Sequence, residues 1–281
     1  MPLALLHRAT HINLALIVDI CGKSDVGLVR QHNEDSYLYG NLETGEKSTQ
    51  ATPAALRIEG GPAVLIVADG VGGAASGELA SSIATDCIFV ELRKWWRSEA
   101  NRGATNIAEG MRWAIDVANE SIWGKAQGAP AHHGMGTTAT IALLVDSEVH
   151  FGQIGDSRGY LIRGGTARQL TKDQSLVQRL IDAGRMTRSQ AEKSEHRNII
   201  LQALGPEQRV VSDLYQETLE NGDFVLVCSD GLSNQVTEEE IGRYAAAAKK
   251  PGDLCSALMA RALETGAPDN VTAVAARVIS A

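Results

Sequence analysis

The chain has 281 residues, of which 44% are hydrophobic and 21% are charged, a balance typical of a globular protein with a sizeable core. The formal net charge of −8 argues against nucleic acid or an anionic membrane as the main partner. No window reaches the ~20 apolar residues of a membrane span, and the N-terminus lacks the pattern of a signal peptide, so we expect a cytoplasmic protein.

The first half of the chain combines short apolar runs with two long amphipathic segments. In chain order, the pattern predicts a strand over residues 12–21, a short strand over 36–39 and a polar loop over 40–61. A buried strand over 63–68 and two helices over 72–97 and 106–123 follow.

The second half returns to strands, interrupted by an excursion of short helices. Strands are predicted over residues 137–145, 148–154, 158–163, 223–229 and 271–279, and helices over 173–183, 187–193, from 237 onward and over 253–264. Thr187 with Gln190, and Thr237 with Glu240, have the spacing of capping boxes. This order favours one layered α+β domain across residues 1–281 rather than a relay of βαβ units.

The four cysteines lie far apart in the sequence. Cys21, Cys87, Cys228 and Cys255 form no CxxC pair. We interpret them as buried free thiols in a reducing compartment, rather than as disulfides or zinc ligands.

Two apolar runs end in the same way. Residues 63–68 lead directly into Asp69-Gly70, and residues 224–229 lead into Asp230-Gly231. A buried strand that ends in an unpaired charge is costly. We therefore expect both aspartates to emerge at one edge of a sheet core and to share a positive partner.

Further acidic residues fit a cation site. Asp156 and Asp269 lie in two more turns, and no cysteine or histidine cluster accompanies them, which points to a hard cation with oxygen ligands. Two such ions, ~4 Å apart, would resolve the repulsion between carboxylates and activate a bridging water. Arg30 lies shortly before Glu34 and Asp35, and a guanidinium can hold phosphate oxygens bidentately.

Six short motifs carry a family resemblance. They are DxGxxRxxNED at 25–35, VADGVGG at 67–73, MGTT at 135–138, GDSR at 155–158, SDGL at 229–232 and DN at 269–270. An Asp-Gly pair alone is common in turns, but six motifs in this order are highly specific. Together they resemble the metal-dependent protein phosphatases of the 2C type, over about residues 12–279.

The resemblance implies a fold and an activity. The implied fold is α+β, with a central β-sandwich of two antiparallel sheets flanked by helices in α-β-β-α layers, and a helical flap at about residues 171–204. The implied reaction is hydrolysis of phosphoserine and phosphothreonine monoesters on proteins, by a water or hydroxide that bridges two metal ions. Two or three divalent cations, Mn²⁺ or Mg²⁺, are the implied cofactors.

The resemblance also implies how the first metal is bound. Carried over by position, Asp69 bridges both metals and the Gly70 carbonyl completes one site. Asp230 and Asp269 hold the first metal, and Asp69 and Asp230 count with the catalytic residues.

Four other residues complete the implied site. Glu34 and Asp35 support the second metal, partly through water, and Asp156 joins Asp230 in a third, weaker site. Arg30 binds the substrate phosphate and acts in catalysis.

One departure from the family pattern concerns the proton donor. Many eukaryotic members have a histidine after the first Asp-Gly, where this chain has Val71, as bacterial-type members also lack it. His196, at the end of the flap, is one candidate donor to the leaving group, and metal-bound water is another.

Two other functions use similar residues. A two-metal phosphodiesterase or nuclease is disfavoured by the acidic charge and the absence of basic runs. A non-catalytic binding module should have lost the metal aspartates, and this chain retains them. We therefore expect a monomeric phosphatase acting on phosphorylated proteins, with a eukaryotic-type Ser/Thr kinase or its substrates as partners, and with neither nucleic acid nor membrane.

Overall fold

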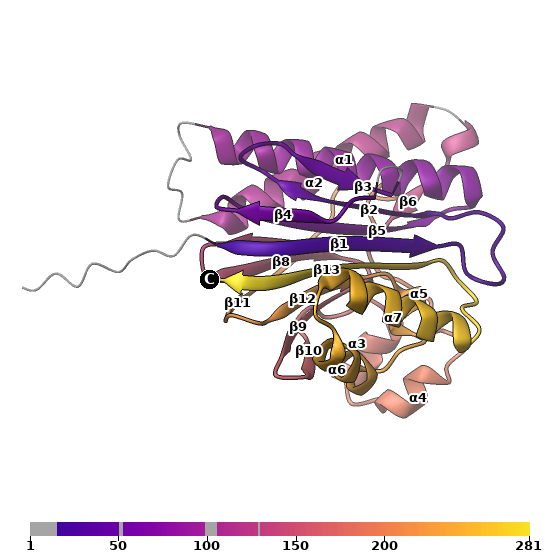
Figure 1. Ribbon diagram of the computed structural model, residues 1–281. Helices are drawn as coiled ribbons and strands as arrows, with labels where there is room; N and C mark the ends of the chain where they lie inside the picture. Colours follow the sequence, from indigo (N-terminus) through magenta and orange to yellow (C-terminus); the bar gives the residue numbers. More distant parts are fainter. Residues whose placement is uncertain (1–15, 51–52, 99–105, 129) are drawn as a thin grey trace, which may run out of the picture.

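The computed structural model describes residues 16–50, 53–98, 106–128 and 130–281 as two antiparallel sheets with helices outside them (Figure 1). The first sheet contains β1 (Ile17–Asp25), β4 (Leu56–Glu59), β9 (Arg158–Arg163), β10 (Thr166–Gln169), β12 (Phe224–Cys228) and β13 (Val271–Ser280). Their spatial order is β10-β9-β12-β13-β1-β4. The chain segments that open and close the sheet in sequence, β1 and β13, are therefore neighbours.

The second sheet lies against the first. It contains β2 (Asp35–Asn41), β3 (Lys47–Thr49), β5 (Ala63–Val71), β6 (Gly136–Thr137), β7 (Ala139–Val145), β8 (Glu148–Ile154) and β11 (Asp213–Thr218). The spatial order is β11-β8-β7-β5-β2-β3, and the short β6 pairs with the end of β5.

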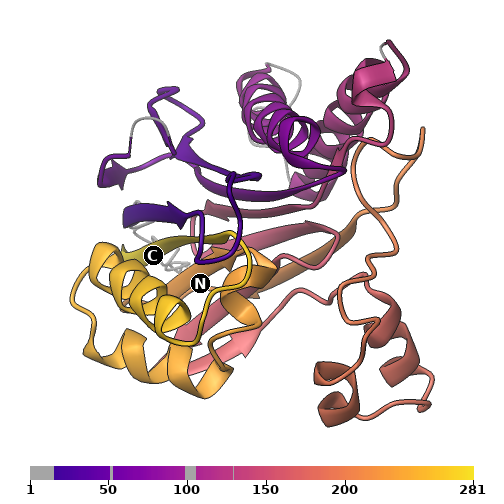
Figure 2. The same cartoon turned by 90° about the vertical axis from the view of Figure 1, so that its right-hand side faces the viewer.

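Helices cover both outer faces of the sandwich. Helices α1 (Ala74–Arg97) and α2 (Ile107–Gly128) lie on the second sheet, while α5 (Asp230–Ser233), α6 (Glu238–Ala247) and α7 (Pro251–Glu264) lie on the first. The two flap helices, α3 (Leu176–Asp182) and α4 (Arg188–Glu192), stand apart from these layers (Figure 2). The predicted α-β-β-α sandwich with a helical flap is thus confirmed.

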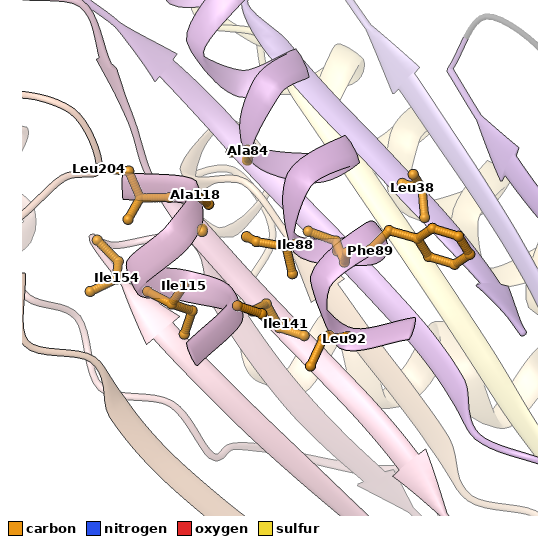
Figure 3. Packing of buried hydrophobic residues seen from close by; sticks show 14 of the residues in the cluster. Leu38, Ala84, Ile88, Phe89, Leu92, Ile115, Ala118, Ile141, Ile154 and Leu204 are labelled. Atoms are coloured by element: carbon orange, nitrogen blue, oxygen red, sulfur yellow. The ribbon is translucent and has the colours of Figure 1, made fainter. Parts of the chain in front are cut away.

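The alternation within β5 explains the layering. Leu65 and Val67 point into the core between the two sheets, whereas Val64 and Ile66 point toward α1 and α2. Figure 3 shows the helix side of this packing, where Ile88 of α1 and Ile115 of α2 meet strand residues. Because both faces of β5 are covered, residues 63–68 are all apolar rather than alternating with polar residues.

The two predicted capping boxes are found at the starts of α4 and α6. Thr187 at the start of α4 and Thr237 at the start of α6 each accept a hydrogen bond from the backbone N–H three residues later. The side chains of Gln190 and Glu240 in turn accept a hydrogen bond from the backbone N–H of Thr187 and Thr237. Both predicted capping boxes are therefore confirmed.

Several sequence predictions were wrong in detail. The polar segment 40–61 is not only a loop, because β3 and β4 form within it as short edge strands. The first strand begins at Ile17, and residues 12–15 lie outside the described part of the chain. Strands β10 and β11 were not predicted. None of the described helices has the length and apolar character that crossing a bilayer requires.

All four cysteines are free, as predicted. Cys228 and Cys255 are buried, but Cys21 and Cys87 are only partly so, which corrects the expectation that all four lie in the interior.

Candidate active site

Asp35 and Asp69 lie opposite each other at one end of the second sheet. Asp35 begins β2, Asp69 lies near the end of β5, and the two are register partners in this antiparallel pair. Directly opposed like charges on neighbouring strands are destabilising. The pairing therefore calls for groups that compensate two carboxylates at this position.

Two hydroxyl groups, one just after β12 and one in β13, hold one oxygen of Asp35. Its Oδ2 accepts hydrogen bonds from Ser229 Oγ at 2.7 Å and from Thr272 Oγ1 at 2.6 Å. Its Oδ1 is buried and has no hydrogen-bond partner among the described residues. A buried acceptor without a partner is unusual in a folded protein, and a cation is one group that would satisfy it.

Asp230 and Asp269 come from two turns that touch. Asp230 follows β12 and begins α5, and Asp269 lies just before β13. A Cβ atom on Gly231 would lie 2.0 Å from the carbonyl oxygen of Asn270, so only glycine allows this approach. Besides burial, the charge of Asp230 raises the pKa of Asp69, so this pair of turns lies close to the β2–β5 pair.

Asn270 joins the turn before β13 to the loop between β1 and β2. Its Nδ2 donates to the carbonyl oxygens of Val26 and His32, both at 2.9 Å, and its Oδ1 accepts from Glu34 N at 2.8 Å. These three bonds give Asn270 a structural role between the two turns.

Arg30 lies on the same loop and reaches Asp269. Its Nη2 donates to Asp269 Oδ2 at 2.8 Å, and its side chain is 51% exposed. This hydrogen bond raises the pKa of Arg30, so the guanidinium stays charged. Among the described residues the bond uses one donor of the guanidinium fork, and the others suit an oxyanion.

Glu34 and Gly70 are packed against the beginning of α1. Gly70 N donates to Glu34 O at 3.2 Å, and a Cβ on Gly70 would lie 2.3 Å from Gly77 O. A Cβ on Gly77 would lie only 1.9 Å from Glu34 Oε2. The two glycines therefore let the Glu34 carboxylate and the Gly70 backbone approach the helix. Sequence reasoning gave Gly77 no such role.

Asp156 lies in the turn between β8 and β9, at the base of the flap. Two residues later, Arg158 forms a bidentate ion pair with Asp173, with Nε–Oδ1 at 3.0 Å and Nη2–Oδ2 at 2.7 Å. Gln174 N donates to Gly155 O at 2.8 Å. These bonds attach the start of the flap to the acidic turn.

The acidic groups share one electrostatic environment. Burial raises the pKa of Asp35 to about 7 and of Asp156 to about 8, and it raises the pKa of Asp69 well above its usual range. The negative charges of Asp35, Asp230 and Asp156 raise the pKa of Asp69 further. Burial, and next the charge of Asp269, raises the pKa of Asp230. Such mutual repulsion is what a bound divalent cation would relieve.

The donor set suits magnesium or manganese. Carboxylate and carbonyl oxygens are the ligands these hard cations prefer, and the unpartnered Asp35 Oδ1 lies within the set. Among the described residues, however, no three acidic, histidine or cysteine side chains form one group that could hold a metal ion as it stands. The individual ligand roles therefore remain predictions.

His196 lies outside this arrangement. Its side chain is exposed between α4 and the end of the flap, and its backbone N–H donates to Ser194 Oγ at 3.1 Å. No contact of the described residues joins it to the carboxylates. Val71 ends β5 and pairs with Gly136.

Comparison with known proteins decides the family. A family model described as protein phosphatase 2C matches residues 51–265. The chain belongs to this family. As a protein phosphatase 2C relative it is a serine/threonine protein phosphatase, a hydrolase of phosphoric monoesters, as the sequence predicted.

Relatives agree along most of this protein phosphatase 2C chain. The serine/threonine phosphatase stp of Listeria welshimeri is 32% identical over 250 residues, which are 89% of this chain and 92% of that protein. Among solved structures, the serine/threonine phosphatase Stp1 of Staphylococcus aureus is 30% identical with a TM-score of 0.80, over 96% of this chain and 98% of that one.

A third relative bears on the cofactor. The catalytic domain of the phosphatase PstP, in complex with two manganese ions, is 32% identical with a TM-score of 0.76. The match covers 95% of this chain and all of that one. For a protein phosphatase 2C chain with this donor set, the predicted use of divalent cations is confirmed at the level of the family.

Proposed function

We propose that this phosphatase acts at the acidic end of the sandwich, with two or three divalent cations, Mn²⁺ or Mg²⁺, held there. The proposed ligands are Glu34, Asp35, Asp69, Gly70 through its carbonyl, Asp156, Asp230 and Asp269. The observation that carries the proposal is the direct opposition of Asp35 and Asp69, together with the unpartnered Oδ1 of Asp35.

The chain's own residues would then have separate roles in binding the phosphate and in orienting the metal ligands. When bound, the cations would neutralise the carboxylates, lower the pKa of water and attract phosphate oxygens. Arg30 would hold the phosphate of the substrate, with Asp269 fixing the direction of its guanidinium. Ser229 and Thr272 would keep the Asp35 carboxylate in one orientation through their two hydrogen bonds.

The leaving serine or threonine oxygen must receive a proton. His196 is one candidate and water in the site is the other. Because His196 is exposed and far along the flap, it would need the substrate or the flap to bring it to the leaving group. His196→Ala tests this directly: an unchanged pH–rate profile excludes the histidine, and loss of one limb supports it.

We also propose the setting in which the enzyme acts. As a single phosphatase domain over residues 1–281, and as a monomer, it would reverse a eukaryotic-type Ser/Thr kinase by acting on that kinase or its targets. The bacterial phosphatases among its relatives support this role. The free state of all four cysteines supports a cytoplasmic location, where thiols stay reduced.

The decisive experiment is hydrolysis of a phosphothreonine peptide in Mn²⁺, Mg²⁺ or EDTA, with wild type and Asp230→Asn compared. Phosphate release that needs a cation and is lost in the variant would support both the activity and the site. A bis-ester substrate run in parallel separates a phosphatase from a phosphodiesterase. Folded wild-type protein that releases no phosphate in either metal would contradict the proposal.

A further inference from the structure

Two large apolar side chains are exposed directly beside the proposed phosphate-binding arginine. Leu28 is 65% exposed and Val29 is 69% exposed, next to Arg30. Single exposed apolar residues are normal on protein surfaces. These two are consecutive, and they adjoin the proposed site for the phosphate of a protein substrate.

The loop that carries them is firmly held. Leu28 N donates to Ala267 O at 2.9 Å, and Asn270 fixes the loop on both sides of the pair, at Val26 and His32. Gly27 has a φ of +78°, and a Cβ there would lie 2.2 Å from Asp269 O, so the turn before Leu28 accepts only glycine. In Figure 1 this is the indigo loop beyond the arrowhead of β1.

The apolar cores of the described residues do not include these side chains. Leu28 and Val29 lie outside all three clusters, the one between the sheets and the two outside them. A loop held at both ends keeps them in place before any partner arrives. Contacts with such a preorganised surface cost less ordering entropy than contacts with a mobile one.

We propose that Leu28 and Val29 form a docking surface, the Leu28–Val29 surface, for an apolar side chain next to the phosphoresidue of the substrate protein. The inference rests on the proposed function, because it requires Arg30 to hold the phosphate. One residue of extended chain spans ~3.3 Å, so a neighbour of the phosphoresidue lies within reach of the residues that adjoin Arg30. An apolar neighbour buries surface there.

Two pairs of peptides test the proposal, one pair for each side of the phosphothreonine. The two peptides of a pair share one sequence and differ only in having leucine or serine beside the phosphothreonine. Wild type should prefer the leucine peptide by about fivefold in kcat/KM, mainly through KM, as expected for partial burial of one side chain. The double variant L28S/V29S should lose this preference, and L28M/V29I, which keeps the surface apolar, should retain it.

Matched controls separate this inference from the proposed function. Val90→Ser removes an exposed aliphatic side chain from α1, away from the β1–β2 loop, and should leave the preference unchanged. Hydrolysis of p-nitrophenyl phosphate by wild type with Mn²⁺ reports on the proposed function without any flanking residue. If wild type hydrolyses this ester but treats both peptides alike, the docking inference alone is overturned.

Three other outcomes would also overturn it. One is an equal loss of kcat/KM by L28S/V29S on both peptides, which would mean that Leu28 and Val29 support Arg30 and do not contact the neighbouring residue of the substrate. Another is a wild-type dimer that the double variant converts to a monomer, which would make the surface a contact between two copies. Failure of wild type on the ester and on both peptides would overturn the proposed function and this inference together.

Discussion

Asp35 and Thr272 are 237 positions apart in the sequence, yet Thr272 Oγ1 donates to Asp35 Oδ2 at 2.6 Å. The bond joins the start of β2 in one sheet to β13 in the other. It also leaves Asp35 Oδ1 as the oxygen available to a cation. The geometry of the candidate metal site thus depends on a hydroxyl group that no metal would touch.

Thr272→Val tests this dependence. Removing the hydroxyl takes a hydrogen bond from a buried charged acceptor, which costs ~1.5–3 kcal/mol. We expect a lower urea midpoint and a weaker Mn²⁺ affinity by calorimetry. Thr166→Val, at an exposed position of edge strand β10, is the control and should change stability by less than ~0.5 kcal/mol. Unchanged Mn²⁺ affinity in Thr272→Val would contradict the orienting role.

Arg30 should matter for the phosphate and hardly at all for folding. Losing charge-assisted bonds to a phosphate costs ~1.5–3 kcal/mol, so Arg30→Ala should lower kcat/KM on a phosphopeptide by about 10- to 100-fold. Arg30→Lys keeps the charge but not the fork, and should recover part of the loss. Arg57 is a matched control, with 50% exposure against 51%, since it pairs with Asp19 and Glu59 on the surface. Equal losses in Arg57→Ala would refute the assignment.

Gly77→Ala should affect the cation site selectively. The added Cβ would meet Glu34 Oε2, the end of a flexible side chain, which has to move aside. We expect weaker Mn²⁺ binding without loss of fold, because alanine is otherwise favoured over glycine in a helix. Gly124→Ala in α2 meets no atom within 4 Å and should stabilise the protein by ~0.5–1 kcal/mol. A Gly77→Ala variant that binds Mn²⁺ like wild type would show that Glu34 is not a ligand.

Stability without metal should fall as the pH rises. Burial sets the pKa of Asp35 at about 7 and of Asp156 at about 8, both above the ordinary value. A raised folded-state pKa means that the protonated carboxyl favours folding. Its contribution is complete below the unfolded pKa of ~3.9 and is lost as the pH rises through the folded values.

The measurement is the Tm in EDTA and in Mg²⁺ between pH 6 and pH 8.5. We expect the Tm in EDTA to decrease with pH and the gain from Mg²⁺ to increase, because the cation binds the ionised carboxylates. Asp156→Asn removes one titrating group and should flatten the EDTA curve. Parallel curves for wild type and this variant would argue against a raised pKa at Asp156.

The sequence predicted the strongly patterned elements and missed the weakly patterned ones. Helices α1 and α2 and strands β5 and β12 have long apolar periodicities that match their burial. Strand β4 has only Leu56 and Ile58 buried, alternating with the exposed and charged Arg57 and Glu59, and β11 is only partly buried. Such short edge strands form because they pair with a strand that is distant in the sequence, β1 for β4 and β8 for β11. The local sequence pattern does not show this pairing.

The same limit applies to the candidate site. Its aspartates were found because each follows or precedes an apolar run in a recognisable motif. Ser229 begins one of those motifs and Thr272 lies two residues after another, but their bonds to Asp35 depend on how β12 and β13 pair. The steric role of Gly77 likewise depends on where α1 meets Glu34. Partners of this kind follow from tertiary packing and not from local spacing.

The position of β13 between β1 and β12 has a consequence for biosynthesis. The ribosome delivers β1 early and β13 late, so β1 lacks its central neighbour until synthesis has passed Ser280. Until then Asp35 has no Thr272, and the Arg30 loop has no Asn270 to hold it. A nascent chain that has not reached β13 therefore has no assembled site, and dephosphorylation can begin only once β13 has been made.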